Sequence, residues 1–499
     1  MIEVPASLSP LFTTRRAGVL LHPTSLPSAG ECGNLGKEAY HFVNFLADVG
    51  LSVWQMLPVG PTHADLSPYQ SLSSYAGNPR LICLDWLVEQ GWFGAESIAG
   101  HTDENRGAIF VQLAEQFTRE QVKEKSALGK RFETFVEDNA HWLEDFCLFQ
   151  ALRDHYRKDP WYRWPMPIRH REPEALTEAH KDLAQPLQRL RFEQFCFFAQ
   201  WQALREYAHS KDVYFFGDIP IFVAHDSADV WANQGQFHLD DDGQPITVAG
   251  VPPDYFSETG QHWGNPHYRW DVMQDDGFQW WLGRIDAQLA LYDLLRVDHF
   301  RGFDAYWSIP GGSEDARTGH WESAPGRALL DTLFEHASPL PIVAENLGVI
   351  TPEVEALRLD YQLPGMRVLQ FAFDGNPQNP HLPHNHEPLE VVYTGTHDNN
   401  TSLGWFEGLT SDERTFVRHY FGCANDEGHW LLIKAALASV AQLAIIPMQD
   451  VLGLGNEHRM NLPGTVDANW RWRFEWQQVP PELVPRLREL LHLYGRLTE

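Results

Sequence analysis

Eight short apolar runs recur along the chain, and their number limits the fold more than any other feature of the sequence. They are rich in β-branched residues or end in turn-forming residues, which is typical of strands and too short for buried helices. Their nearly continuous hydrophobicity predicts a parallel sheet covered on both faces. The runs are residues 18–23, 51–59, 213–222, 291–300, 340–348, 365–374, 389–399 and 443–453.

Helix-like stretches separate these runs. The pattern predicts helices over 39–50, with Gly50 as a C-terminal cap, over 351–361, where Thr-Pro opens the helix, and over 430–444. Eight strands that alternate with helices predict an α/β fold of the (β/α)8 (TIM) barrel type. A doubly wound open sheet is the alternative, but the turn after the first run lacks the Gly-rich phosphate loop expected there.

The spacing of the runs predicts large insertions into one barrel. We expect a single catalytic barrel over residues 1–499, with a mainly helical subdomain inserted over 60–212, between the second and third strands. Residues 223–290, rich in Trp, Asp, Gly and Pro, are expected to form a loop-rich insertion between the third and fourth strands.

Charge and cysteine usage exclude several classes of protein. A formal net charge of −29 argues against a nucleic-acid partner and against anionic membrane surfaces. The 5 cysteines are scattered, with no CxxC pair, which favours reduced thiols in a cytoplasmic protein over a disulfide framework or a zinc site. We find no signal peptide and no apolar stretch long enough to span a membrane, so we expect no membrane association.

Ionisable residues recur at the carboxyl ends of the predicted strands, where such barrels hold their active sites. Arg296 and Asp298 are two residues apart, so they share one face of the fourth strand, while Leu295 and Val297 face the helices. A carboxylate beside a guanidinium stays ionised, as a nucleophile must. The alternative is a structural ion pair that closes the barrel.

Acids also end the fifth and seventh strands. Glu345 follows a buried run, so burial should raise its pKa and fit it to act as a general acid, unless it is an exposed residue that caps the turn. His397 and Asp398 end the seventh run, where they form part of a site or serve as a core histidine and a helix cap. Asp218 and Asp450 end the third and eighth runs.

Acids at the ends of neighbouring strands suit one reaction in particular. Retaining glycoside cleavage needs a carboxylate nucleophile and a carboxylic acid about 5–5.5 Å apart. Neighbouring strands lie about 4.8 Å apart, so Asp298 and Glu345 could straddle a glycosidic bond. This pattern indicates a glycoside-cleaving enzyme.

The sequences around these acids resemble one family. VDHFRG, AENLG and THDN, residues 297–302, 344–348 and 396–399, are similar to those of the 4-α-glucanotransferases called amylomaltases or disproportionating enzymes, glycoside hydrolase family 77 of the α-amylase superfamily. The resemblance covers roughly residues 15–475, through stretches that appear in the expected order: 18–28, 54–62, 67–79, 217–231, 250–270 and 459–465.

The resemblance implies roles for individual residues. Asp298 would be the nucleophile, Glu345 the acid and then the base, and Asp398 would grip and distort the donor sugar. Trp263 would stack on the glucan chain. The other residues that would contact sugar are Arg296, His397, His299, Asp218, Ser67, Tyr69, Gln261 and Asn461.

The resemblance further implies transfer between α-1,4-glucans such as malto-oligosaccharides, without a cofactor, in a monomer or small homo-oligomer. The sequence has no calcium-loop pattern such as DxDxDG, so we expect no metal, and only about 45 residues follow the eighth strand, so we expect no C-terminal β-sandwich. The chain departs from the family at Asp65-Leu66, where Gly-Asp is frequent before Ser-Pro-Tyr-Gln, and at His262 and His267, which bear on the acceptor side.

Three alternatives differ in chemistry. A hydrolase would share the first half-reaction and use water in the second. A pyridoxal-phosphate phosphorylase would need a Schiff-base lysine, and Lys434 lies in an apolar helical stretch without a Gly-rich loop. A non-catalytic glucan-binding protein would need no proton-sharing acids.

Overall fold

Eight parallel strands form a barrel in the computed structural model, which describes residues 9–253, 257–423, 428–465 and 467–497. Each strand overlaps one of the eight runs, so the predicted (β/α)8 barrel is confirmed. The sheet order is β10-β11-β12-β1-β2-β3-β6-β9. The strands are β1 (Arg16–Leu20), β2 (Val53–Gln55), β3 (Tyr214–Pro220), β6 (Leu294–Asp298), β9 (Ile342–Ala344), β10 (Gly365–Val368), β11 (Glu390–Tyr393) and β12 (Leu443–Pro447).

One hydrogen bond joins the two edge strands of this sheet, β9 and β10, and so closes the barrel. The backbone N–H of Ala344, at the end of β9, donates to the carbonyl of Pro364, just before β10, at 2.8 Å. The strands are shorter than the apolar runs because the polar ends of the runs leave the sheet and form loops at the barrel mouth.

Alternating residues of the strands fill two separate cores. Side chains such as Leu294, Val343 and Met366 face inward and pack into one buried cluster inside the barrel. Leu295 and Val297 belong to the larger cluster between the sheet and its helices, as the sequence predicts. Arg296 therefore shares the inward face with Leu294, one pleat nearer the mouth.

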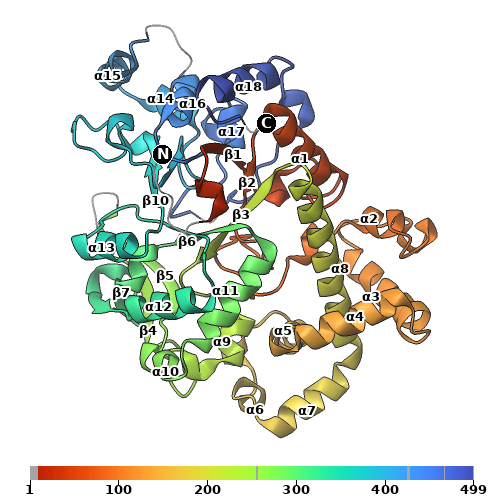
Figure 1. Cartoon of the computed structure of the whole chain (residues 1–499). Helices are drawn as coiled ribbons and strands as arrows, with labels where there is room; N and C mark the ends of the chain where they lie inside the picture. The colour runs from red at the N-terminus through yellow and green to blue at the C-terminus, as the bar shows by residue number, and fades with distance from the viewer. Residues whose placement is uncertain (1–8, 254–256, 424–427, 466, 498–499) are drawn as a thin grey trace.

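Helices cover the outside of the barrel (Figure 1). The predicted helix over 39–50 is α1, and Gly50 caps it in the left-handed region with φ 90°. The helix predicted after Thr351 is α13, with Pro352 in its first turn. The helices around the barrel are α1 (Lys37–Val49), α8 (Ala184–His209), α11 (Gln279–Leu291), α12 (Gly326–His336), α13 (Pro352–Asp360), α14 (Ser402–Gly408), α16 (Gly428–Ala438), α17 (Met448–Val451) and α18 (Leu483–Leu493), and α15 (Ser411–Phe421) packs outside α14 and α16.

The prediction of one helix over 430–444 is wrong at its end. Helix α16 stops at Ala438, and β12 begins at Leu443. The Ser439 hydroxyl accepts the N–H of Ala441 at 3.1 Å, and buried Arg496 donates to the carbonyls of both residues at 2.9 and 2.7 Å. These bonds fix a turn that apolar periodicity alone does not reveal.

The chain between β2 and β3 is mainly helical and lies at the right and bottom of Figure 1. Aromatic side chains hold it together: Phe195 of α8 lies 5.5 Å from Phe132 and 5.7 Å from Phe135, ring centre to ring centre. Its other helices are α2 (Leu84–Glu89), α3 (Arg106–Phe117), α4 (Ala127–Asp138), α5 (Ala140–His155), α6 (Met166–Arg169) and α7 (Pro173–Asp182). That residues 60–212 form a separate subdomain stays a prediction.

The stretch expected to be loop-rich, 223–290, contains more regular structure than the sequence predicts. Its strands β4 (Thr247–Val251) and β5 (Gln261–Pro266) join β7 (Ala305–Pro310) and β8 (His320–Ser323) in a second, antiparallel sheet of order β5-β4-β7-β8. Helices α9 (Ala228–Ala232), α10 (Trp270–Asp275) and α11 also begin there, and residues 254–256 lie outside the described residues. The pairing of β4 with β7 joins segments far apart in sequence, so no local pattern predicts it.

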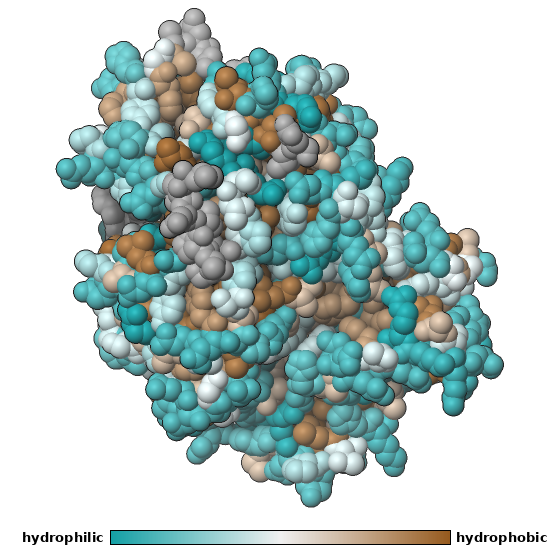
Figure 2. All heavy atoms as spheres, viewed as in Figure 1, coloured by the Kyte–Doolittle hydropathy of each residue, from teal (hydrophilic) through white to brown (hydrophobic). Residues whose placement is uncertain are grey.

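The outer face in Figure 2 is mostly hydrophilic, and hydrophobic residues gather in the hollow between the upper and lower halves of the view. Among the described residues, no helix has the length and apolar character needed to cross a membrane. All 5 cysteines are free thiols, and Cys83, Cys147 and Cys196 are buried.

Candidate active site

The carboxyl ends of β3, β6 and β9 bring three acids together. In the sheet, Asp218 lies opposite Arg296, and Val297 lies opposite Ala344. Asp298 and Glu345 are the next residues along these two paired strands. Glu345 shares the inward face with Val343 of the barrel core, so both acids enter the mouth of the barrel.

Arg296 links two of these carboxylates. Its Nη1 donates to Asp218 Oδ2 at 2.6 Å and its Nη2 to Asp298 Oδ1 at 2.7 Å. Burial would lower the pKa of Arg296, but the two carboxylates outweigh it and raise that pKa well above its usual value. The Asp218 side chain is 1% exposed and that of Asp298 is 30% exposed, so Asp298 is the carboxylate that an entering substrate can reach.

Glu345 is held by two backbone groups. Its Oε2 accepts the N–H of His299 and its Oε1 that of Leu347, both at 2.7 Å. Burial raises the pKa of Glu345 to about 7, the direction predicted from the sequence. Near neutral pH this carboxyl is therefore present in both protonation states, which lets one residue donate a proton and later accept one.

Asp398 and His397 lie in the loop after β11, residues 394–401. Asn461 Nδ2 donates to Asp398 Oδ1 at 2.6 Å, and His397 Nε2 lies 3.3 Å from Asp398 Oδ2. Burial opposes ionisation of Asp398, but His397 and Asn461 outweigh it and lower the pKa of Asp398 to about 2. The same contact raises the pKa of His397 against the effect of burial. Asp398 is therefore ionised throughout the neutral range.

Tyr69 connects the two halves of the site. Its hydroxyl donates to Asp218 Oδ2 at 2.7 Å, and its ring stacks on that of His397, with centres 5.1 Å apart. Trp470 completes an aromatic group, 6.0 Å from Tyr69 and 5.9 Å from His397. Our reading of the sequence missed Trp470, although the Trp-rich run at 470–476 marked the region.

Trp263 reaches the site from the second sheet. Its ring meets the His299 ring edge-on at 4.9 Å, and its Nε1 donates to Gln261 Oε1 at 3.0 Å. Gln70 Nε2 donates to the Trp263 carbonyl at 3.4 Å, which ties this strand to the Tyr69 loop. His299 has φ 55°, a left-handed conformation that is strained for a non-glycine residue, and burial lowers its pKa to about 4.

The remaining residues predicted from the sequence differ in position. Ser67 lies in the same loop as Tyr69, where its N–H donates to Asp65 at 3.2 Å. His262 is exposed on β5. His267 is fully buried against Thr247, and burial lowers its pKa to about 3, so it does not titrate near neutral pH.

Arg301 orders the segment behind the acids. It donates to the carbonyl of Val349, in the loop after Glu345, and its guanidinium stacks 3.9 Å from the ring centre of Trp321 on β8. The segment after β6, the segment after β9 and the second sheet are therefore joined at one side chain.

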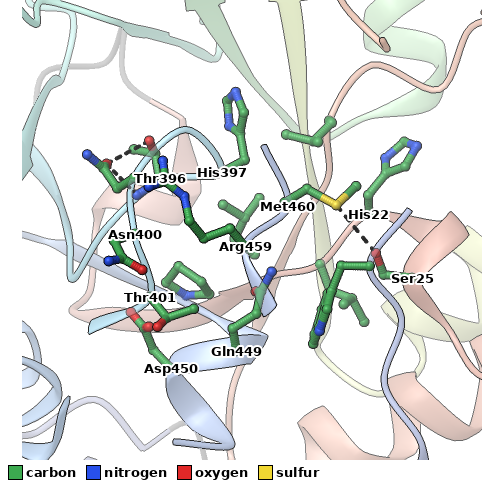
Figure 3. Close-up of a pocket in the computed structure, with 16 residues that line it drawn as sticks. His22, Ser25, Thr396, His397, Asn400, Thr401, Gln449, Asp450, Arg459 and Met460 are labelled. Atoms are coloured by element: carbon green, nitrogen blue, oxygen red, sulfur yellow. Dashed lines mark hydrogen bonds between the residues drawn. The ribbon is translucent and has the colours of Figure 1, made fainter. Parts of the chain in front are cut away.

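A small cavity of about 30 Å³ lies beside His397 (Figure 3), large enough for about one water. Its lining includes His22, Gln449, Asp450, Arg459 and Met460, and none of these except Asp450 was singled out from the sequence. Within the described ranges, no group of three or more His, Cys, Asp or Glu side chains could hold a metal ion.

Comparisons with known proteins indicate one family. Residues 21–478 match the model of the family described as 4-alpha-glucanotransferase. The chain is 48% identical to the 4-alpha-glucanotransferase of Thermus thermophilus, over 97% of this chain and 99% of that one, and 46% identical to that of Synechocystis over the same shares. The solved amylomaltase of Streptococcus agalactiae, in complex with acarbose, superposes with a TM-score of 0.92 at 36% identity, over 97% of this chain and 100% of that one. The chain therefore belongs to the 4-alpha-glucanotransferase family, glycoside hydrolase family 77, and is a glucanotransferase enzyme.

Proposed function

We propose that the enzyme transfers α-1,4-glucan segments by double displacement, with Asp298 as nucleophile and Glu345 as acid and base. One observation carries this proposal: a reachable carboxylate and a buried carboxyl with a pKa of about 7 end two paired strands and enter the barrel mouth together. Retaining enzymes need this pair of carboxyl groups on the two sides of the scissile bond.

In the first half-reaction, a carboxylate oxygen of Asp298 attacks the anomeric carbon of the donor sugar. The bond from that carbon to the 4-oxygen of the leaving chain breaks, and Glu345 gives its proton to this oxygen. Arg296 donates to Asp298 Oδ1, and Oδ2 is left for the attack. The product is a glycosyl ester on Asp298.

In the second half-reaction, the 4-hydroxyl of an acceptor glucan or glucose gives its proton to Glu345 and attacks the anomeric carbon. The ester bond to Asp298 breaks, so the anomeric configuration is retained after two inversions. Glu345 is suited to both steps because burial places its pKa near 7, within reach of either protonation state.

Polar groups around these acids would bind the donor sugar. Asp218 Oδ1 and His299 Nε2 are buried and have no hydrogen-bond partner among the described residues, although each residue sits beside a proposed catalytic acid. Buried polar atoms rarely stay unpaired, so we infer that sugar hydroxyls complete them. Asp398, fixed by Asn461 and His397, would take two further hydroxyls and favour the distorted ring of the transition state.

Trp263, with Gln261, would bind the acceptor side, because its ring lies against His299, the residue after Asp298. Aromatic faces stack on the apolar faces of pyranose rings. Such a wall would favour a glucan over water in the second half-reaction. Ser67, in the Tyr69 loop, would add one hydroxyl contact to the chain.

Maltotriose separates transfer from hydrolysis. We expect purified enzyme to produce glucose together with maltotetraose and longer chains, resolved by chromatography. If only glucose and maltose form, with no longer chain at any time, the enzyme is a hydrolase, the alternative that the sequence leaves open.

The covalent step has its own test. Glu345→Gln, supplied with an α-glucosyl fluoride whose leaving group needs no acid, should form the ester and release it slowly. Mass spectrometry of the digest should find one hexose on the peptide that contains Asp298. An adduct on another residue, or none while fluoride is released in a burst, would contradict the assignment.

We also infer a cytoplasmic enzyme that acts on malto-oligosaccharides as a monomer or small homo-oligomer. The free and largely buried cysteines support a reducing compartment. Cell fractionation tests the location, and light scattering on a sizing column tests the assembly.

A further inference from the structure

Asp450, an acid at the barrel rim that the proposed reaction does not use, is almost fully buried. It lies in α17, just after β12, and is 1% exposed. Both of its oxygens accept hydrogen bonds. Oδ1 accepts the N–H of Ser402 at 2.6 Å, and Oδ2 accepts the hydroxyls of Ser402 at 2.6 Å and Thr394 at 2.5 Å.

These donors stand at the two ends of the loop that carries His397 and Asp398. Thr394 follows the last residue of β11, and Ser402 is the first residue of α14. One carboxylate therefore fixes the separation of the two ends of this loop. Figure 3 shows Asp450 beside Thr401, while the His397 side chain points away from Asp450.

Three other bonds reach this loop from outside, one of them from Asn461 to the Asp398 side chain, and each acts at a single point. Gln370 donates to the carbonyl of Asn400 at 2.8 Å, and Arg459 donates to that of Asp398 at 2.9 Å. Neither residue spans the loop. We propose that Asp450 is a positioning residue, which sets the place of Asp398 and His397 in the donor site by holding both ends of their loop. The inference rests on the proposed role of Asp398.

The geometry separates a need for shape from a need for charge. An asparagine at 450 can accept the Ser402 N–H through its oxygen and donate from its amide to both hydroxyls, because a hydroxyl oxygen can accept. A leucine has nearly the same shape and can make none of these bonds. Burial raises the pKa of Asp450, which also fits a site where charge is dispensable.

The test compares Asp450→Leu with Asp450→Asn. We expect the leucine variant to lose about 100-fold in kcat with less than about a threefold change in KM, because a displacement of about 1 Å costs this much in a positioned site. The asparagine variant should stay within about tenfold of the parent. Similar kcat values for the leucine variant and the parent, per folded molecule, would overturn the proposal.

Glu390→Met is the matched control for stability. Glu390 is also a buried acid of the barrel, but it is the first residue of β11, at the end away from the mouth, and contacts Arg367 and the Glu387 N–H. Both apolar variants should lower Tm, and only Asp450→Leu should lower kcat per folded molecule. An equal loss of kcat in both would mean that Asp450 has a general structural role.

A double variant links the effect to Asp398. If Asp450 acts through this loop, Asp398→Asn combined with Asp450→Leu should be within about threefold of Asp398→Asn alone, whereas independent effects would multiply. Multiplication would overturn the proposal. Full activity of Asp398→Asn would instead remove the proposed role of Asp398 itself. Should Asp450→Leu fail to fold, Ser402→Ala, which removes one of the three bonds, is expected to lose about tenfold in kcat, and an unchanged kcat there would count against the inference.

Discussion

Glu345 and Glu390 are two buried glutamates of one barrel, and they differ in almost everything except their pKa. Burial raises the pKa of each to about 7, and each lies near an arginine, Arg296 or Arg367. Glu390 opens β11 at the amino end of the barrel, 0% exposed, and faces the helix layer. Glu345 follows β9 at the carboxyl end and faces inward, beside the partly exposed Asp298.

The comparison shows that a shifted pKa does not by itself mark an active site. Both glutamates owe the shift first to burial, so the shift reports depth in the fold. What separates them is the end of the strand, the face of the sheet and a neighbouring carboxylate that substrate can reach.

The largest expected difference is between the acids themselves. Asp298→Asn should lower kcat by about four orders of magnitude or more, because an amide cannot form the ester. Glu390→Gln should keep kcat per folded molecule close to the parent and lower Tm, since it weakens a buried pair with Arg367. Initial rates of maltotriose transfer, with calorimetry, measure both. Near-parent transfer by Asp298→Asn would end the proposed mechanism.

The two arginines give the next difference. Arg296→Met should lower kcat/KM on the order of 100-fold, because it leaves Asp218 and Asp298 without their shared donor. Arg367→Met at the other end should affect mainly Tm. Kinetics on folded fractions of both variants distinguish them, and equal kinetic losses would erase the contrast between the two ends.

The pH profile should belong to Glu345 and not to Glu390. Transfer to Asp298 needs the protonated acid, so kcat/KM should fall as pH rises through about 7, roughly tenfold per pH unit above it. Asp398 stays ionised down to about pH 2, so it should add no limb between pH 4 and 8. We expect Glu390→Gln to keep this alkaline limb, whereas Glu345→Gln, assayed with a glucosyl fluoride, should lose it. A profile that is flat from pH 6 to 9 in the parent would contradict the assignment.

The smallest expected effect concerns the wall of the mouth. Trp263→Ala should raise the KM for the acceptor up to about tenfold, the size of one lost stacking contact, and increase the share of hydrolysis. Fluoride release in the first half-reaction should change little and serves as the internal control. A loss confined to that first step would place Trp263 on the donor side.

Much of the barrel could be predicted from the sequence. Each of the eight apolar runs overlaps a strand, because strands buried on both faces need continuous hydrophobicity. The alternation in 294–298 was enough to place Arg296 on the inward face and Leu295 on the other. The turn at 439–442 and the second sheet were not predicted, since distant hydrogen bonds and pairings decide them.

The candidate site divides in the same way. The acids at the strand ends, Asp298, Glu345 and Asp398, could be predicted from the sequence, because the barrel brings the carboxyl ends of its strands together. Trp470 and the cavity beside His397 were not, because they arise from loops that converge from separate parts of the chain. The sequence places Asp450 among the strand-end acids, but it does not reveal the hydrogen bonds that Asp450 accepts from Thr394 and Ser402.

The sequence by itself determined the sheet, the inward face of Arg296 and the acids available at the mouth, because strand periodicity and burial act over a few residues. Tertiary structure alone decided the contacts and the burial of each acid. Glu345 ends its apolar stretch and Glu390 precedes its own, so the sequence indicates which end of a strand each occupies but not what each contacts. Their roles diverge because strand register sets Glu345 beside Asp298, while Glu390 lies against Arg367 on the outer face of the other end.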